Sequence, residues 1–326
     1  MIKIHLASAP KIIDFHYNNI CGKQPGKQQN ISKMFDKYIK KYKHNRYYRE
    51  VLEYLKLHVE KDSNGFSLIT AEPLELKKFI ENFNLKFTGR LTPKLKSILS
   101  YVFYYEDLSK WKAYELGKKL SINVCPYCNR SYTFIVGNDI IKGTRFEYDH
   151  FFSQTDYPYL SLSFYNLIPS CHICNSNFKG DKKFSLENNI HPYLEGFSNE
   201  IVFSIKPRNI NFINGKSTSY RIRFKKGENP TWSNEKIKSA FENITTFQLT
   251  KLYNMHKDYV DEIIMKGMIY SPAYINALYM QFQGTLFNSE SDVKRFVTGN
   301  YVDESDYSKR VLSKLSADIS KELGLI

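Results

Sequence analysis

The sequence has no long apolar run. No stretch reaches the about 18 consecutive apolar residues that a membrane-spanning helix needs. The opening ten residues carry Lys3 and His5 and lack the apolar core of a secretory signal. Together these absences predict a cytoplasmic protein without a membrane partner.

Cysteine is scarce, with five residues in a chain of 326. This excludes a small secreted fold held together by many disulfides. Cys21 stands alone, and the other four form two Cys-x-x-Cys pairs, a spacing that lets two thiolates face one ion. Two such pairs complete the closed tetrahedral site of structural zinc, whereas a redox-active pair is the alternative. The predicted Zn²⁺ ligands are Cys125, Cys128, Cys171 and Cys174.

Acidic residues are outnumbered by basic ones, 33 against 47, which leaves a formal net charge of +14. An excess of cations favours a polyanionic partner, because each lysine or arginine that neutralises a phosphate releases a condensed counterion. We therefore predict nucleic acid as the partner. The alternatives are a basic protein without such a partner, and a genome whose codon usage makes lysine and asparagine frequent.

Residues 23–49 are especially dense in lysine and arginine. Phe35, Tyr38 and Tyr42 recur at three- and four-residue spacing, which predicts an amphipathic helix with these rings toward the core and the cations outward. Such a face suits contact with phosphates, and a solvated or protein-binding face is the alternative. The predicted nucleic-acid contacts in this segment are Lys37, Lys40, Lys41 and Arg46.

No internal repeat or long low-complexity linker interrupts the chain, so we expect its regions to pack together. Alternating apolar residues on either side of Asn214-Gly215 predict a β-hairpin between 201 and 224. Helical periodicity dominates before residue 121 and after residue 234, most clearly at 74–83, 93–105 and 111–120. The predicted regions are a helical region with the basic helix (1–120), a zinc-containing module (121–195), and a β-hairpin followed by helices (196–326).

Polar residues gather between and just after the cysteine pairs. Asp149 adjoins His150 at the end of a predicted strand, Asn166 follows 16 residues later, and Asn175 comes directly after Cys174. An Asp-His pair alone arises often by chance, so only the three ordered positions together with the cysteines are informative. This conjunction resembles the HNH signature of the ββα-metal nucleases. The resemblance implies an α+β, mainly helical chain built around a central ββα-metal module.

The resemblance also implies a role for each polar residue. Asp149 and Asn175 match the family's ligands for a catalytic Mg²⁺ or Mn²⁺, with Asn177 as the alternative to Asn175. His150 matches the general base that takes a proton from the attacking water. Asn166 matches the residue that ties the loop together through side-chain to backbone hydrogen bonds.

Other residues beside the motif are weaker candidates. His172 lies between two zinc ligands and is expected to point toward the surface, and His191 is expected to be structural, with a place at the site as the alternative. Basic residues that flank the loop are expected to position substrate phosphates rather than to react. They are Arg145, Lys179 and Lys182, with Lys183 beside them.

The stretch from Tyr157 to Cys171, YPYLSLSFYNLIPSC, is similar to HNH proteins of bacterial anti-phage operons, including the Septu type and its retron-associated relatives. Those proteins usually work beside an ATPase of the SMC/ABC type, so the resemblance implies such a partner and a defence role. The specific likeness covers roughly residues 121–195, with looser likeness at the opening Met-Ile-Lys-Ile and over 312–325.

We therefore expect a metal-dependent endonuclease that hydrolyses nucleic-acid phosphodiesters, with DNA favoured over RNA or transfer RNA by family habit. A free-standing restriction-type nuclease is one alternative. A zinc-ribbon subunit that binds nucleic acid without cutting is another. A pure binder has no use for Asp149 beside His150 with Asn175 in register.

Overall fold

The computed structural model describes residues 1–6, 8–22, 30–87, 91–107, 111–138, 140–141, 143–208 and 219–326. Within these ranges the chain is an α+β protein in which helices predominate and the strands form two separate antiparallel pairs. The predicted fold class is therefore confirmed at this level. None of the helices in these ranges is long and apolar enough to cross a membrane.

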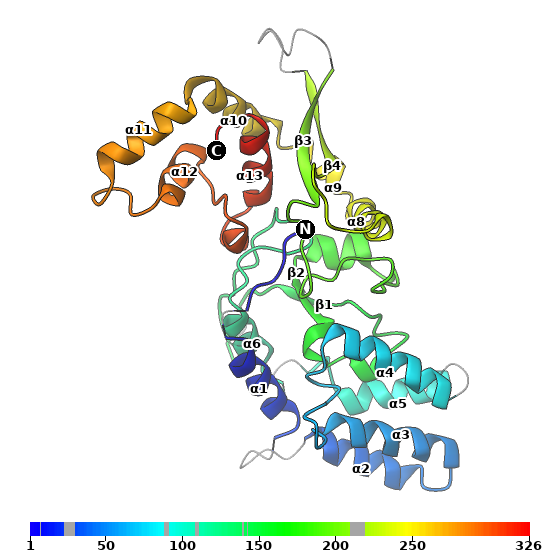
Figure 1. The fold of residues 1–326 in the computed structure, drawn as a ribbon. Helices are drawn as coiled ribbons and strands as arrows, with labels where there is room; N and C mark the ends of the chain where they lie inside the picture. Colours follow the sequence, from blue (N-terminus) through cyan, green and yellow to red (C-terminus); the bar gives the residue numbers. More distant parts are fainter. Residues whose placement is uncertain are drawn as a thin grey trace.

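Six helices form the first part of the described chain. They are α1 (Ala9–Ile20), α2 (Ile31–Lys41), α3 (Arg46–Val59), α4 (Pro73–Lys86), α5 (Pro93–Phe103) and α6 (Ala113–Leu120). Proline in the first turn begins α4 and α5, where its missing N–H costs nothing. The helices predicted at 74–83, 93–105 and 111–120 are thus confirmed. Helices α2 to α5 lie together at one end of the molecule (Figure 1).

The single basic helix predicted over residues 23–49 is wrong. Residues 23–29 lie outside the described residues, α2 ends at Lys41, and α3 begins at Arg46. The break follows from Asn45, whose side chain accepts a hydrogen bond from the backbone N–H of Tyr48 at 2.9 Å and so caps a new helix. Phe35 is fully buried as predicted.

The central part of the chain contains a strand pair followed by a helix. Strand β1 (Glu147–His150) pairs antiparallel with β2 (Leu167–Ser170), and His150 lies opposite Leu167. The loop between them holds two short 3₁₀ turns, η1 (Pro158–Leu160) and η2 (Phe164–Asn166). The seven-residue π-helix η3 (Ile173–Lys179) follows β2 almost directly. The elements β1, β2 and η3 thus follow one another in the order strand, strand, helix.

The last part of the chain begins with a second strand pair. Strand β3 (Ile201–Pro207) pairs antiparallel with β4 (Tyr220–Lys226). The strands of the predicted hairpin are therefore confirmed, while its Asn214-Gly215 turn lies outside the described residues. The helices that follow are α8 (Asn234–Thr246), α9 (Leu249–Tyr253), α10 (Lys257–Ile269), α11 (Pro272–Phe282), α12 (Glu290–Thr298), the 3₁₀ turn η4 (Glu304–Asp306) and α13 (Ser313–Glu322).

One cluster of buried apolar residues extends from Ile12 in α1 to Leu315 in α13. It includes residues of the central strand pair, such as Ile168 and Tyr148. Two strands of four residues bury too little surface to be stable alone, so this shared core supports them. Helix α11 is different, because none of its residues is buried.

Candidate metal centre and adjoining polar site

Four cysteine side chains come together beside the central strand pair. Cys125 and Cys128 lie in the loop after α6, Cys171 follows β2 directly, and Cys174 lies in η3. Their sulfur atoms all lie within 4.8 Å of one another, and none forms a disulfide. The predicted grouping of the two Cys-x-x-Cys pairs is confirmed.

The cluster suits one tetrahedral metal ion. Zn–S bonds of about 2.3 Å place neighbouring sulfurs about 3.8 Å apart, and the Sγ atoms of Cys128 and Cys171 are 4.0 Å apart. Burial raises the pKa of the Cys125 thiol, while hydrogen bonds from neighbouring thiols lower the pKa of Cys171. Four thiolates in this buried space need a cation to compensate their charge. The cluster is thus a potential metal site whose four sulfur donors favour zinc.

Distant segments hold the first cysteine pair in place. The Asn129 carbonyl accepts a hydrogen bond from Leu312 N at 2.7 Å, and the Asn129 side-chain oxygen accepts from Lys314 N at 3.1 Å at the start of α13. Near the amino terminus, the N–H of Ile2 donates to the Pro126 carbonyl at 2.9 Å. The loop that carries the first cysteine pair therefore connects the central module to both ends of the described chain.

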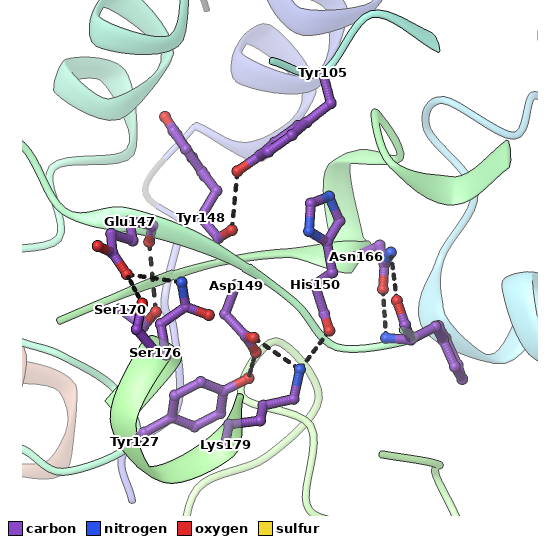
Figure 2. A network of polar contacts seen from close by, with 12 residues as sticks. Tyr105, Tyr127, Glu147, Tyr148, Asp149, His150, Asn166, Ser170, Ser176 and Lys179 are labelled. Atoms are coloured by element: carbon purple, nitrogen blue, oxygen red, sulfur yellow. Dashed lines mark hydrogen bonds and ion pairs between the residues drawn. The ribbon is translucent and has the colours of Figure 1, made fainter. Parts of the chain in front are cut away.

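Strand β1 presents alternate side chains on its two faces, because strand residues alternate with period two. Asp149 is 3% exposed and faces η3, where one of its oxygens lies 2.7 Å from the Lys179 ammonium. Its other oxygen accepts a hydrogen bond from the Tyr127 hydroxyl at 2.6 Å. Burial and the Asp149 carboxylate raise the pKa of Tyr127, so that hydroxyl remains a donor. Figure 2 shows these three side chains converging.

His150 points to the opposite face of β1. Its ring packs edge-on against Tyr105 at 4.4 Å between ring centres, and its Nε2 atom lies 3.0 Å from the Ser161 carbonyl (Figure 2). Burial lowers the pKa of His150 from 6.5 to about 4, so the imidazole is neutral at pH 7. A neutral ring that donates from Nε2 to a carbonyl keeps Nδ1 as its proton acceptor. The ring therefore has the protonation state that a general base requires.

Asn166 joins the two ends of the loop between β1 and β2. Its side-chain oxygen accepts from Phe152 N at 2.7 Å, and its amide nitrogen donates to the carbonyls of Phe152 at 3.2 Å and Leu160 at 3.1 Å. These bonds close the turn that follows His150. Figure 2 shows Asn166 beside the imidazole ring of His150. The side-chain to backbone bonds that the resemblance implied are present. The part of Asn166 in a nuclease site stays a prediction.

Asn175 contacts Glu147 instead of Asp149. Its amide nitrogen donates to a Glu147 oxygen at 2.8 Å, the Ser176 hydroxyl donates to the same oxygen at 3.0 Å, and His172 Nδ1 lies 2.7 Å from the other oxygen. Burial alone would raise the pKa of Glu147, but these hydrogen bonds lower it. The shared role of Asn175 and Asp149 as metal ligands stays a prediction, and Asn177 is exposed.

The predicted phosphate contacts near the loop differ in their surroundings. Lys179 is 4% exposed, and its ammonium donates to Asp149 and to the carbonyl of His150. In this conformation the buried carboxylate holds the ammonium inward, away from solvent, so its contact with phosphate stays a prediction. Lys182 is exposed, and the Arg145 guanidinium lies over the rings of Tyr114 and Tyr148.

The remaining basic and histidine candidates also have defined positions. His172 is exposed beside Glu147, and His191 is buried with its ring 4.2 Å from that of Phe151, as expected of a structural histidine. Lys183 pairs with Asp156 at 2.6 Å. The four cations predicted near the amino terminus are exposed, and Arg46 pairs with Glu50 at 2.7 Å; these cations are Lys37, Lys40, Lys41 and Arg46.

Three residues of the site were missed in the sequence analysis. Tyr127 lies between Cys125 and Cys128, and no other feature of the sequence connects it to Asp149. Glu147 precedes Asp149 by two residues, and strand alternation puts both on one face. That signal is available in the sequence. Tyr105 lies in the turn after α5, and no local pattern indicates its contact with His150.

The known proteins give no further guide to the site. No protein-family model, characterised protein or solved structure matches this chain.

Proposed function

We propose that this protein is a metal-dependent HNH endonuclease. The observation that carries the proposal is the strand, strand, helix order of β1, β2 and η3 beside the four-cysteine cluster, with Asp149 and His150 at the end of β1. A half-buried, neutral histidine next to a carboxylate, in a loop closed by Asn166, offers the general base and the metal-ligating oxygens that phosphodiester hydrolysis needs.

In the proposed reaction His150 accepts a proton at Nδ1 from the attacking water, while Ser161 holds the ring through Nε2. Asp149, with the side-chain oxygen of Asn175, would hold the divalent cation, and their oxygen donors suit Mg²⁺ or Mn²⁺. The cation supplies charge stabilisation for the phosphoryl oxygens and the leaving group. Zinc at the cysteine cluster has a structural role and takes no part in the chemistry.

The ion pair between Asp149 and Lys179 bears directly on this assignment. Carboxylate and ammonium are both buried at 2.7 Å, so a cation at Asp149 requires the Lys179 ammonium to withdraw. Lys179 is the last residue of η3. We propose that its ammonium turns toward a substrate phosphate once the Asp149 carboxylate has another counterion.

The experiment is a cleavage panel with purified zinc-loaded protein. Labelled plasmid, single-stranded DNA, total RNA and transfer RNA are incubated with Mg²⁺ or Mn²⁺, and with neither. Cleavage of at least one substrate that requires the added cation is expected, with DNA as the favoured substrate. If no substrate were cut under any metal condition, with or without a partner ATPase, the nuclease proposal would fail.

Partner and biological role rest on the resemblance in sequence alone. We propose that the protein acts in anti-phage defence beside an ATPase of the SMC/ABC type. Adding the ATPase encoded next to its gene, with ATP, to the same panel is expected to raise the cleavage rate. An equal rate with and without such a partner would favour a free-standing restriction-type nuclease.

A non-cleaving zinc protein that binds nucleic acid is the second candidate. The observation that favours it is the pairing of Asp149 with Lys179 and Tyr127, which satisfies the carboxylate without a metal. This candidate predicts nucleic-acid binding with no product in the panel, with or without the ATPase. The two functions therefore give opposite results in one experiment.

A further inference from the structure

The ribbon formed by β3 and β4 carries a group of cations that the proposed site does not use. One of its faces carries three exposed cations, Lys206, Arg221 and Arg223. Lys225 lies on the same face, half-buried, and pairs with Glu322 at 3.5 Å. Within the described parts of the chain, the three exposed cations take part in no ion pair. In Figure 1 the ribbon extends away from β1 and β2, at the end of the molecule opposite α2 and α3.

The strand register explains why these cations share a face. Lys206 lies directly opposite Arg221, and Ser204 lies opposite Arg223, two residues further along β4. The other face is apolar and buried, with Phe203 opposite Phe224 in the same register. Like charges directly opposite each other destabilise a strand pair. An anionic partner would offset that repulsion.

The base of the ribbon is held firmly at both edges. Along β3, the N–H of Phe203 donates to Asp318 at 2.9 Å and that of Ile205 donates to Glu322 at 2.8 Å, both carboxylates belonging to α13. Along β4, the Asn254 side chain accepts from Ile222 N at 3.1 Å and donates to its carbonyl at 2.6 Å. A two-stranded ribbon is marginal by itself, so these caps keep it as a fixed arm.

We propose that this basic ribbon binds double-stranded DNA by lying in its major groove. The inference deepens the proposed function, because it names the substrate class, and it rests on that function for its biological sense. The positive charge of this face favours a polyanionic partner. The shape decides among polyanions, since the B-DNA major groove, about 12 Å wide, admits a two-stranded ribbon, whereas the deep, narrow groove of A-form RNA does not.

The test measures binding without cleavage, in buffer free of Mg²⁺ and Mn²⁺, at several salt concentrations. The ligands are a duplex DNA of about 30 base pairs, which spans about three helical turns, the RNA duplex of the same sequence, and single-stranded DNA. The variant is Lys206→Gln/Arg221→Gln/Arg223→Gln. A matched control removes three exposed lysines from other helices, Lys11→Gln/Lys78→Gln/Lys94→Gln. A charge-preserving variant, Lys206→Arg/Arg221→Lys/Arg223→Lys, checks that the ribbon tolerates substitution.

For duplex DNA the ribbon variant is expected to lower the slope of log affinity against log salt by about 0.9 for each phosphate that is no longer neutralised, or up to about 2.7 in all. The matched control, the charge-preserving variant and binding to duplex RNA are expected to keep the wild-type slope. An unchanged DNA slope would overturn the inference. An equal loss on the RNA duplex or on single strands would overturn it too, because the face would then bind phosphates without regard to groove shape.

Cleavage of the substrate panel is measured separately, so the two proposals fail independently. Suppose that no substrate is cut, while the ribbon variant binds duplex DNA less tightly than the wild type. This result would refute the nuclease proposal and support the ribbon inference. If the protein cuts a substrate and the ribbon variant keeps the wild-type salt dependence of binding to duplex DNA, only the ribbon inference is refuted.

Discussion

Lys179 and Asp149 form a buried ion pair at 2.7 Å, and taking these two charges out of water costs free energy. Both are 3% exposed, and removing one member of a buried pair leaves an uncompensated charge. The carboxylate also accepts from Tyr127, so an amide at that position keeps a partner for the hydroxyl. This geometry makes the coupling between the two residues measurable.

The Lys179→Met variant is expected to lose about 3 to 5 kcal/mol of unfolding free energy, because Asp149 is then buried without its ion-pair partner. The double variant Asp149→Asn/Lys179→Met is expected to regain most of it. Urea denaturation of the single and double variants measures the coupling. The control is Lys183→Met, because Lys183 is exposed and its pairing with Asp156 is worth about 1 kcal/mol or less. Simple additivity of the single substitutions at 149 and 179 would contradict the buried pair.

His16 makes stability depend on pH. It is fully buried, its Nε2 atom lies 2.8 Å from the Leu162 carbonyl, and burial lowers its pKa from 6.5 to about 4. Since the pKa is lower in the folded state, the unfolded chain binds an extra proton between these values. The contribution to stability is complete above pH 6.5 and is lost as pH falls toward 4, by about 3 kcal/mol.

The His16→Gln variant, which keeps a donor for Leu162, is therefore expected to reduce the fall of unfolding free energy between pH 6.5 and 4. Urea denaturation at several pH values gives that fall for each protein. Comparing variants cancels the protons taken up by the metal ligands, which all variants share. The exposed His44→Gln is the control. Parallel pH profiles for wild type and His16→Gln would contradict a neutral buried ring.

At the scale of elements, the four-cysteine cluster joins parts that are distant in sequence. The Cys128 carbonyl accepts a hydrogen bond from the Tyr253 hydroxyl of α9, and the neighbouring Asn129 caps the start of α13. Coordination energy is folding energy when the unfolded chain has no preformed site. Loss of the metal should therefore loosen the C-terminal helices as well as η3.

Cys128→Ser is expected to release about one equivalent of zinc and to lower the melting temperature, since a broken four-thiolate site forfeits coordination energy. Elemental analysis and thermal denaturation measure the two effects. Cys21→Ser is the matched control, because Cys21 lies outside the cluster, and it should keep the metal. A wild type that contains no zinc, or a disulfide found by mass spectrometry under reducing conditions, would contradict the assignment.

Helix α2 offers a second charged surface, at the opposite end of the molecule from the ribbon (Figure 1). If it binds phosphates, Lys37→Gln/Lys40→Gln/Lys41→Gln should flatten the salt dependence of binding by roughly 0.7 to 0.9 log units for each phosphate released, without changing sequence preference. Adding Arg46→Gln should change less, because Arg46 lies on α3 and pairs with Glu50. Titrating the variant with nucleic acid at several salt concentrations, without any protein partner, tests whether α2 binds phosphates. An unchanged slope would assign these cations to a protein surface or to solvent.

At the scale of the molecule, the sequence predicted what depends on local spacing. The cysteine pairs predicted the metal cluster, and alternation predicted β3 and β4, because both signals lie within a few residues. Two of the features that it missed depend on tertiary structure. The inward turn of Lys179 toward Asp149 and the placing of Asn175 against Glu147 follow from how η3 packs on β1. The helix break at Asn45 was signalled locally by a capping residue within the dense basic run.

The shared core explains why so small a module can hold a site at all. Residues of β1 and β2 belong to the same buried cluster as α1 and α13, and the Tyr148 hydroxyl donates to the Ala113 carbonyl of α6 at 2.8 Å. Side chains from outside the module thereby fix the strand that carries Asp149 and His150. The residues that support the site therefore come from elements throughout the described chain.

The central claim of the proposed function is that His150 acts as the general base of a nuclease. The measurement is the single-turnover cleavage rate of zinc-loaded wild type and His150→Ala with the best substrate of the panel in Mg²⁺, with equal zinc content and equal binding as controls. We expect a fall of about 10²- to 10⁴-fold for His150→Ala, because general-base catalysis typically contributes that much. The same rate in both proteins would contradict this role of His150.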